Sequence, residues 1–288
     1  MKILSFGEIL WDVYPNEAYI GGAPFNFAAH SVKQGGVAYM LSALGNDELG
    51  IKAKSELRKL GVLCDYVTFY DDIETGKCLV TLDENSVPSY NLLNNVAYDY
   101  ISSENLPNIF DVLYFGTLAL RSEYNFSSIK SLFKTNSFKE IFVDVNIRAP
   151  FYSEDRVRFA VENATILKIS LEELNIVGEI LGIKADNYKT FAKELSKNYD
   201  NLNCVIITLG PDGAYALDCK AQQDYSCGCN DVKVVSTVGA GDSFSAAFLH
   251  KYLKGTNLRE CLAYATKVAE LVVSSPEAIP EYKKEDIK

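Results

Sequence analysis

A glycine-rich junction late in the chain has the residue types needed to bind an anion and move a proton. The segment Ser236-Thr237-Val238-Gly239-Ala240-Gly241-Asp242 joins an apolar run, Val232 to Val235, to residues 243–253, which have the pattern of an amphipathic helix. The glycines permit a tight turn, and the free N–H groups at a helix start attract a phosphate-like anion. A carboxylate beside an anion is repelled by it unless it accepts a proton, so Asp242 is a candidate general base.

Two known phosphate motifs do not fit this junction. A Walker A loop needs a lysine directly after its second glycine, and none follows Gly241. A dinucleotide-binding fingerprint needs a third glycine at the position of Phe244. Two interpretations stay open: an anion site with a base, or a plain helix-entry turn with an acidic first-turn residue.

A second segment near the N-terminus has residues that suit a sugar. Gly7-Glu8-Ile9-Leu10-Trp11-Asp12 is followed by Gly21-Gly22-Ala23-Pro24-Phe25-Asn26. Gly21 and Gly22 permit close backbone approach, and Asp12 with Asn26 would hold the vicinal hydroxyls of a sugar. The alternative is a simple helix-entry turn, with Asp12 an exposed strand residue.

Apolar runs that alternate with helical patterns must position these residues. Such an alternation predicts a doubly wound α/β fold with a mostly parallel sheet flanked by helices. The predicted strands are Lys2–Gly7, Val37–Leu41, Val112–Phe115, Ile141–Val145, Thr165–Ile169 and Val205–Thr208, and the predicted helices include 24–34, 47–60 and 258–273.

Two regions break the alternation. Residues 10–20 and 77–93 have the mixed polar and apolar pattern of strands with no helix between them, and Asp83-Glu84-Asn85 is a predicted turn. We expect them to form a small separate sheet, a β lid of about residues 10–22 and 77–98, over a substrate cleft. The lid would belong to a single domain spanning residues 1–288.

Composition narrows the function classes. The 288-residue chain is 48% hydrophobic and has a net charge of −10, which argues against nucleic acid or an anionic membrane as partner. It has no apolar run of membrane-spanning length and no secretory leader, so we expect a cytoplasmic protein with reduced cysteines. Cys219, Cys227 and Cys229 lack the spacing of a zinc site.

Several ordered motifs resemble the ribokinase-like (PfkB) carbohydrate kinases, most closely their fructokinase branch. The similar segments are Gly21-Gly22-Ala23-Pro24-x-Asn26, 44–50 (LGNDELG), Asp144-x-Asn146-x-Arg148, Lys168-x-Ser170-x-x-Glu173, Thr208-x-Gly210-x-x-Gly213, Thr237-x-Gly239-Ala240-Gly241-Asp242 and 276–280 (PEAIP). Together they cover nearly the whole chain.

The resemblance implies a role for each matching residue. Asp242 would be the base, kept ionised by early helix amides, and the N–H groups of Gly239, Ala240 and Gly241 would form the anion hole. The sugar-binding residues would be Asp12, Gly21, Gly22, Asn26, Asn146 and Arg148, with a backbone face from Gly116-Thr117-Leu118.

For the nucleotide, the resemblance implies an ATP site. Its residues would be Lys168, Glu173, Thr208, Gly210, Gly213, Ala265 and Thr266, the last two beside adenine. Glu173 would organise Mg²⁺ through water, although Ser170 to Glu173 is also a good capping box. The chain departs from the family at Thr266, usually asparagine, and at Ser236 and Glu277, usually aspartate and glycine. Because Ser236 has no carboxylate to offer as a ligand, activation of the enzyme by K⁺ is less strongly implied.

The leading hypothesis is an ATP- and Mg²⁺-dependent kinase that phosphorylates a primary hydroxyl of a small sugar, fructose above all. The alternatives are 2-keto-3-deoxygluconate, ribose or a nucleoside as substrate, and a sugar or nucleotide sensor without turnover. An α/β dehydrogenase fits poorly because the third glycine is absent. Tyr14, Tyr19 and Tyr90 on the lid strands would suit a homodimer interface, or would face the sugar.

Overall fold

A nine-stranded twisted sheet forms the centre of the molecule. The computed structural model describes residues 1–82 and 88–287. All neighbouring strands run parallel except at one edge, where β11, β12 and β13 pair antiparallel. In spatial order the strands are β13 (Gln223–Cys227), β12 (Ala214–Asp218), β11 (Cys204–Thr208), β10 (Ile166–Ser170), β9 (Glu140–Asp144), β8 (Val112–Gly116), β1 (Lys2–Phe6), β4 (Val37–Gly45) and β5 (Leu63–Tyr70).

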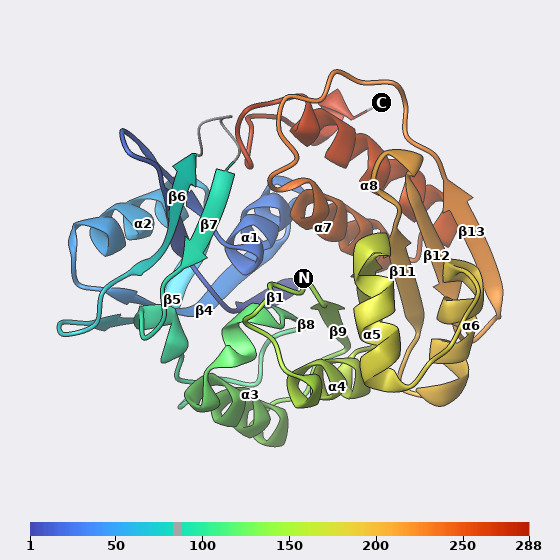
Figure 1. Cartoon of the computed structure of the whole chain (residues 1–288), viewed down its shortest axis with the longest axis horizontal. Coiled ribbons are helices and arrows are strands. Elements are labelled where there is room, and N and C mark those ends of the chain that lie inside the picture. Colours follow the sequence, from blue (N-terminus) through green and yellow to red (C-terminus); the bar gives the residue numbers. More distant parts are fainter. Residues whose placement is uncertain (83–87, 288) are drawn as a thin grey trace.

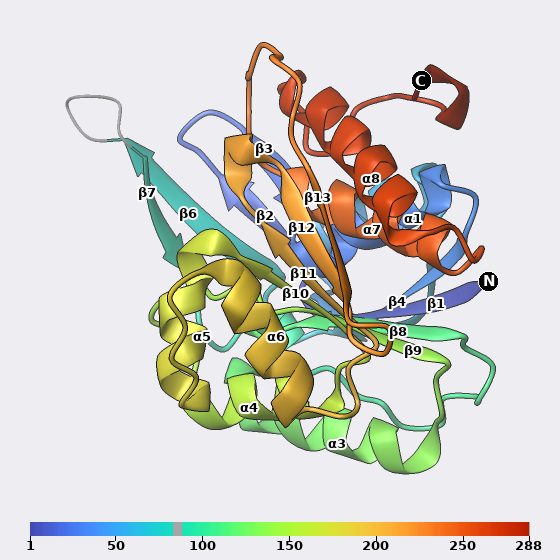
Figure 2. The same cartoon turned by 90° about the vertical axis from the view of Figure 1, so that its right-hand side faces the viewer.

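Helices cover both faces of this sheet, as Figure 2 shows. One face carries α1 (Ala23–Lys33), α2 (Glu48–Lys59), α7 (Ala240–Tyr252) and α8 (Leu258–Val273). The other carries α3 (Glu123–Thr135), α4 (Glu154–Asn163), α5 (Leu174–Leu181) and α6 (Tyr188–Asn198). The predicted doubly wound α/β fold is therefore confirmed. Within the described part of the chain, no helix combines the length and apolarity needed to cross a membrane.

Two apolar cores explain why the central strands read as continuous hydrophobic runs. Successive side chains of a strand point to opposite faces, so both faces must be apolar when helices cover both. Ile3 and Ile166 belong to the core under α1 and α7, whereas their chain neighbours Leu4 and Leu167 belong to the core under α3 and α4. All four side chains are fully buried.

A separate four-stranded sheet projects from one side of the central sheet (Figure 1). Its order is β3 (Ala18–Gly21), β2 (Leu10–Val13), β6 (Gly76–Leu82) and β7 (Pro88–Leu92), with β2 and β6 parallel. The indole of Trp11 donates a hydrogen bond to the carbonyl of Leu49, 3.1 Å away, and so attaches this small sheet to the start of α2. We call these four strands the lid. The turn expected at Asp83-Glu84-Asn85 lies outside the described residues.

The chain returns from the lid through residues 93–101, which we call the lid root. It includes one turn of 3-10 helix at Ala97–Asp99 and leads to β8. Beyond β8, a second 3-10 turn at Leu118–Arg121 precedes α3. The β12–β13 hairpin was not predicted, because Ala214–Asp218 and Gln223–Cys227 lack the helical segment that separated the other strands.

Candidate active site

The start of α7 presents unpaired backbone N–H groups at the carboxyl edge of the sheet. Gly239 precedes the helix with a left-handed φ of 80°, and a Cβ there would lie 2.5 Å from the carbonyl oxygen of Ala278. Ala240 N–H, expected in the anion hole, instead donates to the carbonyl of Thr237 at 3.3 Å. The N–H groups of Gly239, Gly241 and Asp242 have no acceptor among the described residues, so these three amides at the positive end of the helix are available to an anion.

Asp242 is buried in the first turn of α7 and is held from α1. The side-chain amide of Asn26 donates to Asp242 Oδ2 at 2.8 Å. The other side-chain atom of Asn26, Oδ1, is buried without a partner among the described residues. Asn26 therefore orients the carboxylate of Asp242, and its Oδ1 can still accept a hydrogen bond.

Burial raises the pKa of Asp242 to about 7. Asn26, Lys168 and Arg148 lower it and Asp144 raises it further, but loss of water is the largest effect. The expected effect of the helix amides, which would keep Asp242 ionised, is thus opposed by burial, because loss of water disfavours the charged carboxylate. A base whose pKa lies near neutrality suits proton transfer at neutral pH.

A buried ion pair lies beside the helix start. Lys168 and Asp144 face each other across the β10–β9 pairing, and Lys168 Nζ is 2.7 Å from Asp144 Oδ2. Although burial opposes the charge, Asp144 raises the pKa of Lys168, so the ammonium stays protonated. A Cβ on Gly241 would lie 3.3 Å from this nitrogen, which places the ammonium next to the open amides. Asp144 was not singled out from the sequence, although it begins a motif that was.

The lid contributes a carboxylate to the same side of the molecule. Asp12 lies on β2, opposite Cys78 on β6, and burial raises its pKa. Arg148, exposed in the loop after β9, lowers the pKa of Asp12 and also that of Asp242. Its charge therefore acts on both the lid and the buried base. No carboxylate of the described residues forms an ion pair with Arg148.

The two early glycines lie where the lid meets α1. Gly21 ends β3, and Gly22 precedes α1 with φ 111°, where a Cβ would come 2.5 Å from the carbonyl oxygen of Glu8. Glu8 Oε1 accepts the N–H of Ala23 at 3.2 Å, and Oε2 is buried without a partner among the described residues. Burial raises the pKa of Glu8 to about 7. Sequence reasoning missed Glu8; its signal was an acidic residue at the end of an apolar strand.

Glu173 joins two loops at the carboxyl edge of the sheet. Its Oε1 accepts the N–H of Ile147 at 2.5 Å, and Oε2 accepts the N–H of Ser170 at 2.7 Å. The capping interaction expected from the sequence is thus present, and burial raises the pKa of Glu173. Asn146, in the loop that Glu173 holds, has a left-handed φ of 44°, which asparagine tolerates.

The turn at Gly116-Thr117-Leu118 is fixed to the same loop. Thr117 Oγ1 donates to the carbonyl of Val145 at 2.7 Å, and the backbone N–H of Thr117 reaches the same oxygen at 3.3 Å. This turn therefore lies beside the strand end that leads to Asn146 and Arg148.

The expected nucleotide residues divide into two groups. Thr208 ends β11, and Gly210 and Gly213 form the turn after it, where a Cβ on Gly210 would meet no atom within 4 Å. Ala265 and Thr266 on α8 are instead 0% and 4% exposed. Ala265 packs into the core under α8, and Oγ1 of Thr266 is buried without a partner among the described residues, so the contact with adenine stays a prediction.

Comparisons with known proteins agree on one family. Residues 4–285 match the family described as pfkB family carbohydrate kinase. A probable fructokinase of Arabidopsis thaliana is 27% identical, over 96% of this chain and 93% of its own length. An uncharacterized sugar kinase of Pyrococcus horikoshii, solved in complex with ATP, is 25% identical with a TM-score of 0.82, covering 99% of this chain and 96% of its own.

A further solved structure shows the same fold at lower identity. The 2-dehydro-3-deoxygluconokinase of Thermotoga maritima is 22% identical with a TM-score of 0.83, over 100% of this chain and 98% of its own. The family match spans nearly every element that builds the site. The chain belongs to the pfkB family of carbohydrate kinases and is, as such, an ATP-dependent sugar kinase.

Proposed function

We propose that this enzyme transfers the γ-phosphoryl group of ATP to a primary hydroxyl of fructose. The observation that carries the proposal is the buried Asp242, oriented by Asn26 at a helix start whose next amides are open. A site that only bound an anion would gain nothing from a carboxylate there. Fructose is favoured because the relatives include fructokinases across most of the chain.

In the proposed reaction, Asp242 accepts the proton of the sugar hydroxyl while that oxygen bonds to the γ-phosphorus and the bond to the β-phosphate oxygen breaks. Negative charge spreads over the transferring group, and fixed positive charge must stabilise it. The ammonium of Lys168 and the open N–H groups of Gly239, Gly241 and Asp242 would supply that charge, and Ala240 continues the turn. Asp144 keeps Lys168 protonated and in place.

The sugar would lie between the lid and α1. Asp12 from the lid would accept hydrogen bonds from sugar hydroxyls, and the free Oδ1 of Asn26 would accept another. The backbone at Gly21 and Gly22 permits close approach, and Asn146 with Arg148 would close the side formed by the loop after β9. Closing the lid over the sugar would exclude water and limit hydrolysis of ATP.

The residues present fit Mg²⁺ held mainly by ATP. Each carboxylate oxygen of Glu173 accepts one backbone N–H, which leaves lone pairs for metal-bound water. Bound there, the ion would neutralise phosphate charge. The described residues contain no cluster of three or more His, Cys, Asp or Glu able to hold a metal, which suits an ion that arrives with its nucleotide. The hydroxyl of Ser236 accepts the N–H of Val238 at 3.3 Å, and no carboxylate is available at this position for K⁺.

A second substrate class is favoured by Arg148. Its guanidinium is exposed and, among the described residues, has no ion-pair partner, so it would suit the carboxylate of an acid sugar such as 2-keto-3-deoxygluconate. Ribose and nucleosides lack that group. An acid sugar would pair its carboxylate with the guanidinium of Arg148, whereas fructose has no carboxylate to pair with it.

An assay of ADP release with fructose, 2-keto-3-deoxygluconate, ribose, glucose and nucleosides tests the proposal. We expect the highest kcat/KM with fructose. A higher value with 2-keto-3-deoxygluconate, abolished in Arg148→Ala, would replace fructose by the acid sugar. ADP release that no sugar stimulates would favour a sensor.

We also propose that the enzyme is cytoplasmic. In addition, we propose that two copies of the chain form a homodimer through their lids. Tyr19 and Tyr90 lie on lid strands with 53% and 59% of their surface exposed. Such exposed aromatic side chains are enriched at protein interfaces. Sedimentation of the wild type and of the double variant Tyr19→Ser/Tyr90→Ser tests the proposed dimer. A dimer held by the lid would become a monomer in the double variant.

A further inference from the structure

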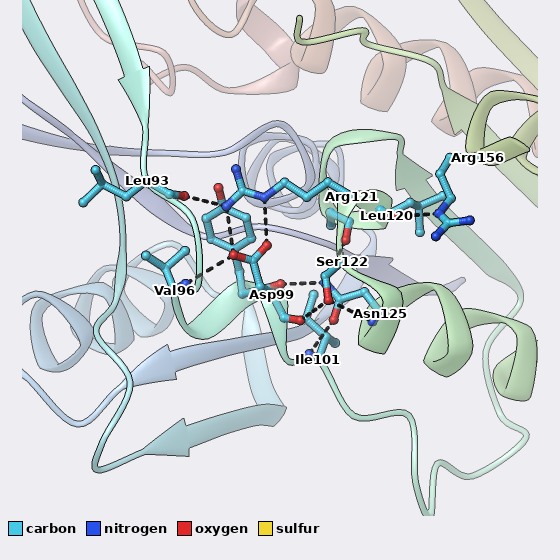
Figure 3. Close-up of polar contacts among 11 residues, drawn as sticks. Leu93, Val96, Asp99, Ile101, Leu120, Arg121, Ser122, Asn125 and Arg156 are labelled. Carbon is cyan, nitrogen blue, oxygen red and sulfur yellow. Dashed lines mark hydrogen bonds and ion pairs between the residues drawn. The ribbon is translucent and has the colours of Figure 1, made fainter. Parts of the chain in front are cut away.

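One arginine connects the lid root to the body of the enzyme. Nε and Nη2 of Arg121 donate to the two carboxylate oxygens of Asp99 at 2.8 and 2.9 Å, and Nη2 also donates to the carbonyl of Leu93 at 2.6 Å. Both charged side chains are only 8% exposed. Arg121 follows β8, whereas Leu93 and Asp99 belong to the lid root, so the contact crosses from body to lid (Figure 3).

The rest of the lid root is held by the residues that follow Arg121. Ser122 Oγ donates to the carbonyl of Asp99 at 2.5 Å. The side chain of Asn125 donates to the carbonyl of Tyr98 at 2.7 Å and accepts the N–H of Ile101 at 2.7 Å. Ser122 and Asn125 lie at the start of α3, which makes this short segment a fixed base for the lid (Figure 3).

The guanidinium of Arg121 also lies over two aromatic rings. Its central carbon lies 4.8 Å from the ring centre of Tyr98 and 4.9 Å from that of Phe151. Tyr98 packs with Leu10 and Cys78 in the small core of the lid. Cys78 is the cross-strand neighbour of Asp12.

Phe151 belongs to the other side of that site. It is in the loop after β9, and its N–H donates to the carbonyl of Arg148 at 2.6 Å. Arg121 therefore contacts Tyr98, which packs against the lid strands that carry Asp12 and Cys78, and Phe151, in the loop that carries Arg148. Asp12 and Arg148 are the two charged side chains expected to hold the sugar.

The third nitrogen of Arg121 faces the interior without a partner. Nη1 is buried and makes no hydrogen bond to the described residues, and in Figure 3 it points away from Asp99. Burial lowers the pKa of Arg121, but the hydrogen bonds to Asp99 together with nearby charges outweigh it and raise the pKa, and the charge of Glu8 adds a smaller rise. Oε2 of Glu8 also lacks a partner among the described residues. The guanidinium is thus buried, with one nitrogen unpaired among the described residues, and is not a plain surface ion pair.

We propose that Arg121 is a positioning residue for sugar binding, which sets the distance between Asp12 on the lid and Arg148 on the body. The inference rests on the proposed function. It assigns Arg121 no contact with the sugar and no part in proton or phosphoryl transfer. Loss of the guanidinium should therefore weaken sugar binding and leave the chemical step intact.

Arg156 provides a matched control. Its side chain is also 8% exposed, stacks on an aromatic ring (Phe126), and donates to the carbonyl of Leu120, next to Arg121. Its ion-pair partners are Glu123 and Asp155, and among the described residues none of its hydrogen bonds or ion pairs reaches the lid root. Arg156→Ala therefore removes a comparable buried guanidinium from the body alone.

Steady-state kinetics of Arg121→Ala and Arg156→Ala, with the best sugar of the wild type, test the proposal. We expect Arg121→Ala to raise the sugar KM at least about tenfold, with kcat and the KM for ATP within about twofold of wild type. Millimolar guanidinium chloride should lower the sugar KM of Arg121→Ala most of the way to the wild-type value. It should have no such effect on Arg156→Ala. Arg121→Lys should rescue little, because an ammonium cannot reproduce the two-pronged contact with Asp99.

Amide hydrogen exchange gives a readout that does not need activity. We expect faster exchange at residues 93–99 in Arg121→Ala and no change there in Arg156→Ala. Equal effects of the two variants on the sugar KM, or a folded Arg121→Ala with an unchanged sugar KM, would overturn the proposal. A wild type that phosphorylates no sugar would refute the proposed function instead, and the exchange result would still decide whether Arg121 fixes the lid root.

Discussion

The phosphoryl end and the sugar end of the proposed site are built by different means. At the phosphoryl end, Lys168 and Asp144 come from adjacent strands of the central sheet, and Asp242 begins a helix packed on that sheet. At the sugar end, Asp12 lies on a separate small sheet that is attached to the body through Trp11 and through the lid root. The proposed chemical groups thus belong to the central sheet and its helix, whereas the position of Asp12 depends on where the lid lies.

This difference predicts that changes at the two ends affect different kinetic constants. Substitutions at the phosphoryl end should lower kcat, because they remove interactions that matter most in the transition state. Substitutions in the lid should raise the sugar KM, because they alter ground-state binding. The predictions below test this division.

The largest effect is expected for Asp242→Asn. An amide cannot accept the hydroxyl proton, so kcat should fall about 10²–10⁴-fold while the variant stays folded. Asp111→Asn is a control, because Asp111 precedes β8 at the opposite edge of the sheet, pairs with Lys139 and should leave kcat unchanged. Near-normal turnover in Asp242→Asn would refute the assignment of the base.

A smaller effect, on KM alone, is expected for Asp12→Ala. Loss of a hydrogen bond to a charged group costs about 1.5–3 kcal/mol, so the sugar KM should rise about 10- to 150-fold with little change in kcat. Glu17→Ala is the control from the turn between the lid strands β2 and β3, since among the described residues this exposed carboxylate accepts only the hydroxyl of Tyr19. A fall in kcat as large as the rise in KM would contradict the division between the two ends.

The pH dependence of kcat/KM should show the titration of Asp242, and we expect this effect to be smaller than those of the two substitutions above. Asp242, with a pKa of about 7, must be deprotonated to act. From pH 8 to pH 6 the deprotonated fraction, and with it kcat/KM, should fall about tenfold. The profile is measured with saturating ATP in a buffer series. A kcat/KM that does not change between pH 8 and pH 5 would show that no group with this pKa acts as the base.

The smallest effect concerns stability. Because burial raises the pKa of Asp242, the folded state holds its proton more tightly than the unfolded state, and this contribution to stability is lost as pH rises from about 4 to about 7. Asp242→Asn has no such loss. Its free energy of unfolding relative to wild type should therefore improve by at least about 1 kcal/mol from pH 5 to pH 8. Urea unfolding at both pH values measures this, and a constant difference would contradict it.

The sequence predicted the fold and the site residues unequally. The parallel sheet followed from apolar runs that must be buried on both faces, and the position of Asp242 followed from its glycine turn. The pair of Lys168 and Asp144 could not be predicted, because it depends on the register between strands 24 residues apart. The raised pKa of Asp242 and the burial of Ala265 depend on how completely side chains pack, and no local pattern contains that information.

The hydrogen bond between Asn26 and Asp242 joins residues 216 positions apart in the chain. A ribosome completes α1, the lid and most of the central sheet well before it makes α7. Throughout that time the growing chain has its sugar-side residues but no base, and Asn26 has no carboxylate to orient. The carboxylate that we propose as the proton acceptor is therefore among the last parts of the site to be synthesised, and the contact between α1 and α7 can form only late in synthesis.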